Sequence, residues 1–200
     1  MSKFSRVFFG LVVSCGMAML LGGCAHPIQL TSDINKIPAA SNGKIAKTAA
    51  YVISAEDRAR QVTTAGGGGD KVSYFPYRDL EPGVYKALSQ VFDDVVKLDS
   101  EKDQATIAAK HVSVIVLPQI ETSSSSDSLL TWPPTQFNIY LNCKVQGAAG
   151  EPIALVKATG QGNATFSEFT GNFSLSAQRS SEAALADLVK QLSVAPELRR

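Results

Sequence analysis

The sequence predicts an α+β domain in which a mainly antiparallel sheet carries two amphipathic helices on one face. Three observations support this fold class. Apolar and polar residues alternate over positions 137–146, as in a strand with one buried face. A β-branched run at positions 111–120 is typical of a buried central strand. Two further segments, around Val84 and around Leu185, space their apolar residues as amphipathic helices do.

The chain begins with a short basic stretch and an apolar run at positions 7–21. This run is shorter than the about 20 residues that a helix needs to cross a bilayer, which is typical of a transport signal. It ends in Leu21-Gly22-Gly23-Cys24, which resembles the lipobox of bacterial lipoproteins. The resemblance implies a signal peptide at positions 1–23 that is cleaved just before Cys24, and a diacylglyceryl group on the thiol of Cys24. An ordinary secretory signal with an incidental cysteine is the alternative.

The same resemblance implies where the protein is held. In lipoproteins the new N-terminus is also acylated, typically with palmitate, and three acyl chains are enough for stable membrane binding. The residue after the cysteine is Ala25 rather than aspartate. In the enterobacterial sorting pattern this implies the outer membrane, with the protein on its periplasmic face. Apart from the covalent lipid, no cofactor is expected.

The composition excludes several function classes. The 200 residues include 19 basic and 18 acidic side chains, so no strong positive field is available to bind nucleic acid. Two histidines and three cysteines are too few for a zinc cluster or a disulfide framework. Cys15 would leave with the signal and Cys24 would carry lipid. Cys143 then remains as a free thiol, and its place in an alternating run predicts a buried core residue.

Positions 24–43 are expected to form the lipidated N-terminus and a tether. They mix proline, serine, asparagine and glycine without periodicity, as in a linker that holds a domain off a membrane. However, Ile28, Leu30 and Ile34 are not typical of a free linker. An edge strand that runs along the domain is therefore the alternative.

The folded domain is expected over positions 44–195, before a tail at 196–200. It opens with a strand at 49–53 and a helix start that Ser54 caps. Four glycines at 66–69 then predict a flexible loop or hairpin tip. A phosphate-binding loop is excluded, because neither the Walker pattern nor the dinucleotide-binding pattern is present.

An aromatic cluster of Tyr74, Phe75 and Tyr77 precedes the first amphipathic helix. It could form a docking surface, although packing of the helix entrance against the sheet is the more frequent use of such residues. Pro82 suits the first turn of this helix, where its missing N–H costs nothing. The expected apolar face of the helix consists of Val84, Leu88, Val91, Phe92 and Val95.

The central strand is expected to end near Pro118. A serine-rich loop follows and carries Leu129, Leu130 and Trp132. These three side chains indicate either an interaction tip, in contact with a partner or with lipid, or a plug over the core. The plug is preferred, because apolar loop residues near a domain edge usually cover core.

The strand at 137–146 and a second strand at 152–166 are expected to form an antiparallel hairpin around a turn at 147–150. Gly160 and Gly162 indicate a bulge or a bend in the second strand. The last element is a helix at 176–192. Its apolar face consists of Ala177, Ala184, Leu185, Leu188 and Leu192.

We find no catalytic constellation in the sequence, and we expect no enzyme and no metal site. His111 is the only histidine in the expected domain and has no nucleophile motif beside it, so it is interpreted as a strand-end residue. The acidic residues after the first helix lack the spacing of a calcium loop, which favours a solvated surface. These acidic residues are Asp93, Asp94, Asp99, Glu101 and Asp103.

The order of elements resembles the YajG-like family of bacterial lipoproteins over most of positions 44–195. The glycine loop at 66–69 and the serines at 123–126 depart from that pattern. The matching features are the Cys24 anchor, Arg78-Asp79-Leu80 before the first helix, Val114-Ile115-Val116 in the central strand, the hairpin and the alanine-rich last helix.

Two functions are compatible with these observations. The preferred one is a non-enzymatic envelope lipoprotein that binds a protein partner or acts as a scaffold. The alternative is an accessory lipoprotein of an envelope lipid-transport system. In that case the apolar loop, or a groove between helices and sheet, would contact acyl chains. A filled interface between helices and sheet would argue against the groove.

Overall fold

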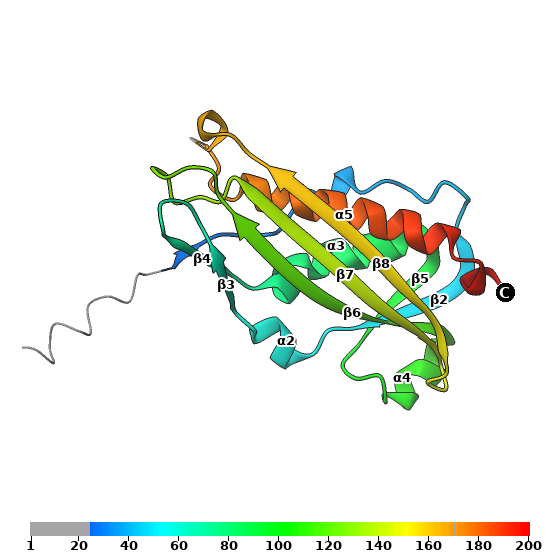
Figure 1. Cartoon of the computed structure of the whole chain (residues 1–200). Helices are drawn as coiled ribbons and strands as arrows, with labels where there is room; N and C mark the ends of the chain where they lie inside the picture. Colours follow the sequence, from blue (N-terminus) through cyan, green and yellow to red (C-terminus); the bar gives the residue numbers. More distant parts are fainter. Residues whose placement is uncertain (1–24, 170) are drawn as a thin grey trace, which may run out of the picture.

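The computed structural model describes residues 25–169 and 171–200. The predicted signal peptide, the lipobox and Cys24 lie outside these residues. The described chain has the predicted α+β fold and contains a five-stranded and a three-stranded sheet. The two longest helices lie on one face of the larger sheet, as the sequence predicts (Figure 1).

The larger sheet has the strand order β5-β2-β6-β7-β8, so the β-branched run forms the central strand β6, as predicted. The predicted hairpin is formed by β7 and β8, and both β6–β7 and β7–β8 are antiparallel. At the other side of the sheet, β2 pairs in parallel with β5 and with β6. The strands are β2 (Ile45–Val52), β5 (Phe92–Leu98), β6 (Val112–Ser125), β7 (Gln136–Gly147) and β8 (Pro152–Asn163).

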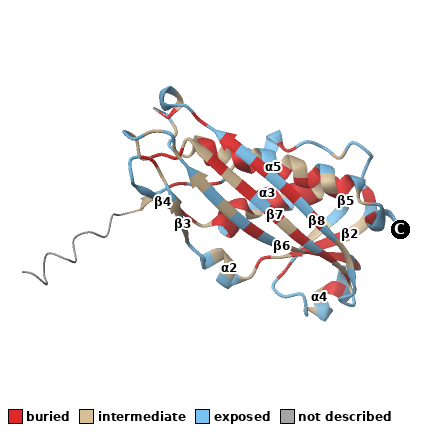
Figure 2. Ribbon diagram, viewed as in Figure 1, coloured by how far each residue is buried: buried red, intermediate tan, exposed pale blue. Residues whose placement is uncertain are grey.

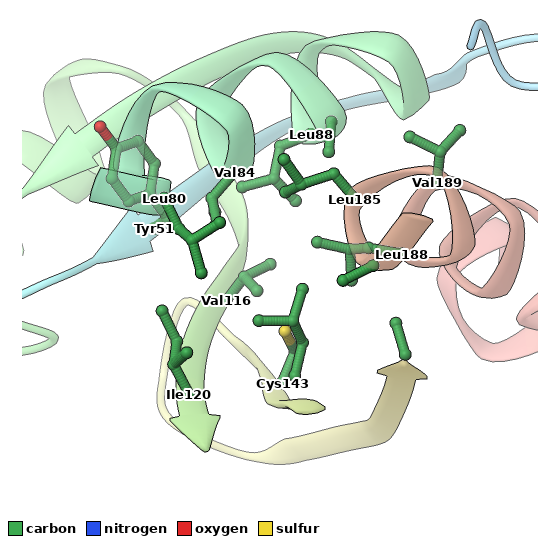
Figure 3. Packing of buried hydrophobic residues seen from close by; sticks show 14 of the residues in the cluster. Tyr51, Leu80, Val84, Leu88, Val116, Ile120, Cys143, Leu185, Leu188 and Val189 are labelled. Carbon is green, nitrogen blue, oxygen red and sulfur yellow. The ribbon is translucent and has the colours of Figure 1, made fainter. Parts of the chain in front are cut away.

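Two helices, α3 (Pro76–Val91) and α5 (Leu175–Val194), pack against each other and against the inner face of this sheet. Leu188 of α5 points toward Cys143 of β7, whereas Leu185 of α5 points toward α3 and lies beside Leu88 (Figure 3). All five predicted apolar residues of the last helix are fully buried. The interface is therefore filled, which argues against an acyl-chain groove between α5 and the sheet.

A smaller apolar cluster lies on the opposite face of the sheet, under the short helix α4 (Gln104–Ala109). Ala50 of β2 and Ile115 of β6 belong to it, whereas their neighbours in each strand belong to the main core. This alternation is expected of strands that are covered on both faces. The rest of the outer face is mostly exposed (Figure 2).

The three-stranded sheet has the order β1-β4-β3 and consists of β1 (His26–Pro27), β3 (Val62–Ala65) and β4 (Lys71–Tyr74). The glycine run joins β3 to β4 as a hairpin connection, as predicted. Before β3, the helix α2 (Ala55–Ala59) begins where expected, and the Ser54 hydroxyl accepts a hydrogen bond of 3.0 Å from the Asp57 N–H.

The first amphipathic helix begins earlier and ends earlier than the sequence indicates. Pro76, rather than Pro82, stands in its first turn, and Pro82 lies inside the helix. The helix ends at Val91, so Phe92 and Val95 belong to the strand β5 instead of the helical face. Pairing of β5 with β2 overrides the helical spacing, because it satisfies the backbone of a segment rich in valine.

Strand β6 continues past Pro118 to Ser125, so the first serines of the expected loop are strand residues. The last pairing of β6 with β2 joins Tyr51 to Val116, which lies before the proline. Two residues after Pro118, the Ile120 N–H donates to Tyr77 Oη at 3.2 Å rather than to β7. By the period of a strand, the nitrogen of Pro118 also faces away from β7, where no strand needs its missing donor.

Gly160 and Gly162 do not form the expected bulge, because the register with β7 is regular at both positions. They mark instead a close approach of β8 and α5. A Cβ atom at Gly160 would collide with the Ser180 carbonyl oxygen, and one at Gly162 with the Ser176 carbonyl oxygen. The two glycines thus let the helix backbone lie directly on the strand.

Candidate interaction surface

The N-terminal segment is packed against the domain and is not a free tether. Leu30 is completely buried, and Ile28 and Ile37 retain only about 5% and 4% exposure. The Ile28 N–H donates to the Ser73 carbonyl at 2.9 Å, and the Leu30 N–H donates to Asp79 Oδ2 at 3.3 Å. The edge-strand alternative is correct only for His26–Pro27, which pair with Val72 and Ser73. The rest of the segment follows the domain without strand structure, and its apolar side chains are buried because they gain more from the core than from solvent.

His26 places the start of the described chain beside the serine-rich loop. Its ring stacks on Trp132 with a centroid distance of 4.4 Å and an interplanar angle of 18°. The ring of Phe173 also contacts Trp132, with a centroid distance of 5.0 Å. Three segments that are distant in the sequence thus meet at one end of the molecule (Figure 1).

The β3–β4 connection with its four glycines, called the glycine hairpin below, is hydrogen-bonded to the serine-rich loop. Gly67 donates its N–H to the Trp132 carbonyl at 2.8 Å, and Gly68 donates to the Ser128 carbonyl at 3.1 Å. A Cβ atom at Gly67 would collide with the Thr131 carbonyl oxygen. The run of glycines therefore has a packing role, which the sequence alone does not show because the contacting loop follows about sixty residues later.

Leu129 and Leu130 are 87% and 95% exposed at the tip of this loop. The preferred prediction of a plug is therefore wrong for both leucines, and it holds only for Trp132, which packs partly against the core. The serine side chains explain the conformation of the loop. Ser126 Oγ accepts the Ser128 N–H at 3.1 Å, and Ser128 Oγ accepts the Leu130 N–H at 3.3 Å, so these two backbone groups are paired while the leucines are exposed.

Tyr74 and Tyr77 are buried, so the docking interpretation of the aromatic cluster is wrong for both. Tyr74 Oη lies 2.8 Å from Thr122 Oγ1, and burial raises the pKa of this phenol. Phe75 is half-buried under the guanidinium of Arg78, whose central carbon lies 3.9 Å from the ring centroid. These aromatic residues join the helix entrance to the sheet, which is the more common of the two uses.

Two exposed phenylalanines, which the sequence interpretation missed, lie at the same end of the molecule as the leucines. Phe166 is 67% exposed and Phe173 is 51% exposed. They belong to the segment between β8 and α5, which the Ala164 N–H ties to the Thr135 carbonyl at 2.9 Å. Aromatic residues within a short polar turn were the signal that could have found them. We call the exposed side chains of Leu129, Leu130, Phe166 and Phe173 the apolar tip.

An ion pair fixes the segment that carries Phe166. Arg179 Nη2 donates to Glu168 Oε1 at 2.7 Å, and the Thr165 N–H donates to Glu168 Oε2 at 2.9 Å. Together with the Thr165 hydroxyl, these hydrogen bonds hold the pKa of Glu168 at about 2. Because the folded state lowers this pKa, the interaction is complete above the ordinary value of 4.5 and is lost as the pH falls through about 2.

We therefore expect the Glu168 carboxylate to titrate with a midpoint near 2, as followed by the NMR chemical shift of its side chain. Arg179→Ala should move this midpoint toward 4.5, because the main donor is lost. Lys157→Ala, at an exposed position of β8, is the matched control and should leave the midpoint unchanged. A midpoint near 4.5 in the parent protein would contradict the assignment.

A second cluster of titratable side chains surrounds Glu81. Glu81 receives Arg58 Nε at 2.7 Å and Lys97 Nζ at 3.1 Å, and Tyr51 Oη lies 3.3 Å away. Burial would raise the pKa of Glu81, but the hydrogen bonds from Lys97 and Arg58 lower it below its usual range. Burial, together with Glu81, raises the pKa of Tyr51 to about 12. This cluster joins α3 to α2, β2 and β5 and offers no free base.

The remaining predicted chemistry can be placed in the fold. His111 is exposed and has a φ of 52°, a left-handed conformation that closes α4 before β6. Cys143 is fully buried, as predicted, and burial raises the pKa of its thiol to about 12. The acidic residues lie on β5 and the following turn, and Asp103 caps α4 by accepting the Thr106 N–H at 3.1 Å. Within residues 25–169 and 171–200, no three potential ligands lie together in a metal-binding arrangement.

None of the helices that the structure describes combines the length and the apolar character of a membrane span.

No protein-family model matches this chain, and no curated protein is similar enough in sequence to count as a match. Among solved structures, it is similar to protein XCC0632 of Xanthomonas campestris, described under the family designation DUF330. The TM-score is 0.45 at 13% identity, and the alignment covers 83% of this chain and 92% of that one.

It is also similar to PelC of Paraburkholderia phytofirmans, which was crystallised as a dodecamer. The TM-score is 0.41 at 12% identity, covering 76% of this chain and 94% of PelC. A variant of PelC in another crystal form gives 0.36 at 13% identity, covering 76% of this chain and 93% of that one. Similarity at this level carries no argument about function.

Proposed function

We propose that this protein is a non-enzymatic, lipid-anchored binding or scaffold module of the bacterial envelope, held on the periplasmic face of the outer membrane. The observation that carries the proposal is Leu21-Gly22-Gly23-Cys24 at the end of a signal-like apolar run. The resemblance to YajG-like lipoproteins belongs to the same proposal.

The start of the fold supports an anchored module. His26 pairs with Val72 of β4, and Leu30 is fixed in the core, so the chain is ordered from the second residue after Cys24. A lipid on Cys24 would therefore hold the domain at a defined end.

A binding role is supported by the surroundings of the side chains that could otherwise act as a catalytic base or nucleophile. The Glu81 carboxylate is saturated by two cationic side chains, Cys143 is buried, and His111 stands on an exposed turn. A protein of the envelope is the proposed partner, and nucleic acid is not.

The anchor is tested by metabolic labelling of growing bacteria with an alkyne analogue of palmitate, followed by mass spectrometry of the N-terminal peptide. We expect the mature chain to begin at Cys24 and to carry a diacylglyceryl group and a third acyl chain. Cys24→Ser should abolish the label, because its hydroxyl is a much weaker nucleophile than a thiol. Cys143→Ser, the matched control, should retain it. Unlabelled parent protein, or a label on Cys143, would overturn the anchor.

The binding role is tested by native mass spectrometry of the gently extracted protein, with Cys24→Ala as the unlipidated form. A near-stoichiometric added protein mass in both forms would support the module. Phospholipid-sized adducts that persist on Cys24→Ala, without any added protein, would contradict it in favour of lipid handling.

A further inference from the structure

We propose that the apolar tip is a membrane-contacting surface. Leu129, Leu130, Phe166 and Phe173 would enter the interfacial layer of the phospholipid leaflet that holds the lipid on Cys24. The domain would then rest directly on the bilayer instead of hanging from a tether. This inference rests on the proposed lipid anchor, and its test keeps the two apart.

The first argument is the distance that the chain allows. Only Ala25 separates Cys24 from His26, and an extended chain covers at most about 3.6 Å per residue, so the two Cα atoms lie within about 7 Å of each other. His26 itself is fixed by pairing with Val72 and by stacking on Trp132. A lipid on Cys24 must therefore bring this end of the domain to the membrane surface.

The second argument is that the apolar tip lies at this same end. The ring of Trp132 contacts both His26 and Phe173. Leu129 and Leu130 precede Trp132 by three and two residues, in a loop that is hydrogen-bonded to the glycine hairpin. The serine-rich loop lies near β1, and the turn between β8 and α5 lies at the same end of the molecule, opposite α4 (Figure 1).

The third argument is the chemistry of the surface. Leucines that are 87% and 95% exposed gain free energy when they leave water, and tryptophan and phenylalanine favour the interfacial layer. Two backbone N–H groups of the loop are already paired, because Ser126 Oγ and Ser128 Oγ accept hydrogen bonds from the Ser128 and Leu130 amides. A loop whose amides are paired enters a membrane interface at lower cost than one with free amides.

Charge does not explain the contact. Asp70 lies 3.7 Å from His26, Asp127 stands two residues before Leu129, and Arg179 is paired with Glu168, so no cluster of cationic side chains is observed beside the apolar tip in the described residues. The attraction is therefore apolar. It should depend neither on anionic lipid nor on salt concentration, unlike the binding of a basic surface.

Trp132 is the single tryptophan of the chain, so its fluorescence reports on this surface alone. The test uses the lipidated protein in phosphatidylethanolamine and phosphatidylglycerol vesicles whose acyl chains carry bromine near the headgroup. We expect strong quenching of Trp132 in the parent and its loss in Leu129→Ser/Leu130→Ser. Leu155→Ser, which removes a 57% exposed leucine near the start of β8, is the control and should retain the quenching.

A second measurement separates the tip from the anchor. Unlipidated Cys24→Ala protein should bind the same vesicles weakly in a flotation assay, independently of salt, and the double serine variant should bind about tenfold or more weakly than this form. If labelling fails at Cys24 but this difference is found, the anchor is wrong and the tip stands. Equal quenching in the parent and the double variant would overturn the proposal that the apolar tip contacts the membrane. Exposure of Trp132 to water in the vesicle-bound parent would overturn it as well, including the case in which a protein covers the leucines.

Discussion

Replacing Gly162 with alanine should lower the free energy of unfolding by about 3 kcal/mol, although alanine normally stabilises a strand relative to glycine. The reason is the contact between β8 and α5. A Cβ atom at this position would collide with the Ser176 carbonyl oxygen and the Ser180 amide nitrogen, which are backbone atoms of a helix that the core holds in place. The helix must move away from the sheet, and its buried leucines would lose their packing.

Urea unfolding followed by circular dichroism measures this effect, and an unchanged denaturant slope would show that the fold is retained. Gly171→Ala is the matched control, because a Cβ atom there has no heavy atom within 4 Å. It should change the stability by less than about 0.5 kcal/mol. Equal stability of the two variants would mean that β8 and α5 are not in the close contact described above.

Leu30→Ala should cost about 3 kcal/mol of stability, within the range for a fully buried leucine. The residue lies in the segment that the sequence indicates as a tether, where truncation of a side chain would have no effect. In the structure Leu30 belongs to the main core, and its N–H is held by the buried carboxylate of Asp79. The same change should increase proteolytic cleavage before residue 44, since the segment is released first.

Ile34→Ala gives the matched comparison within the same segment. Ile34 is 40% exposed on the 3-10 turn η2 (Ile34–Lys36), so its truncation should cost well under about 1 kcal/mol. Similar small effects of both substitutions would show that the segment is a free linker after all. A large effect of Leu30→Ala alone would place the start of the folded unit close behind Cys24.

Local patterns in the sequence are sufficient for most of the larger sheet and for α5. The alternation around Cys143 predicts β7 and its buried face, and the spacing of Leu185 and Leu188 predicts the face that α5 turns to the sheet. The β-branched run predicts a central strand. These elements are long and periodic, so one residue more or less does not change the interpretation.

Elements that depend on distant partners could not be predicted in this way. The strand β5 needs β2 as its neighbour, and without that neighbour Phe92 and Val95 continue a helical pattern. The apolar residues Ile28 and Leu30 were noticed, but their burial depends on Ser73 and Asp79. The surface around Trp132 combines residues from three separate segments, so no single stretch of sequence contains it.

The contacts of the N-terminal segment also determine when the protein can finish folding. The Gln29 N–H donates a hydrogen bond to Ser174 Oγ, Lys36 Nζ donates to Glu182 Oε1, and Arg199 Nη2 donates to the Gly43 carbonyl oxygen. These pairs are 145, 146 and 156 residues apart in the sequence. A chain is made from its N-terminus, so the first residues to be synthesised wait for the last ones. Until α5 is complete, Ile28 and Leu30 have no core to enter, and the chain must be kept from aggregating by other means. Folding is thus completed after synthesis rather than during it, and in an exported protein it would be completed beyond the membrane.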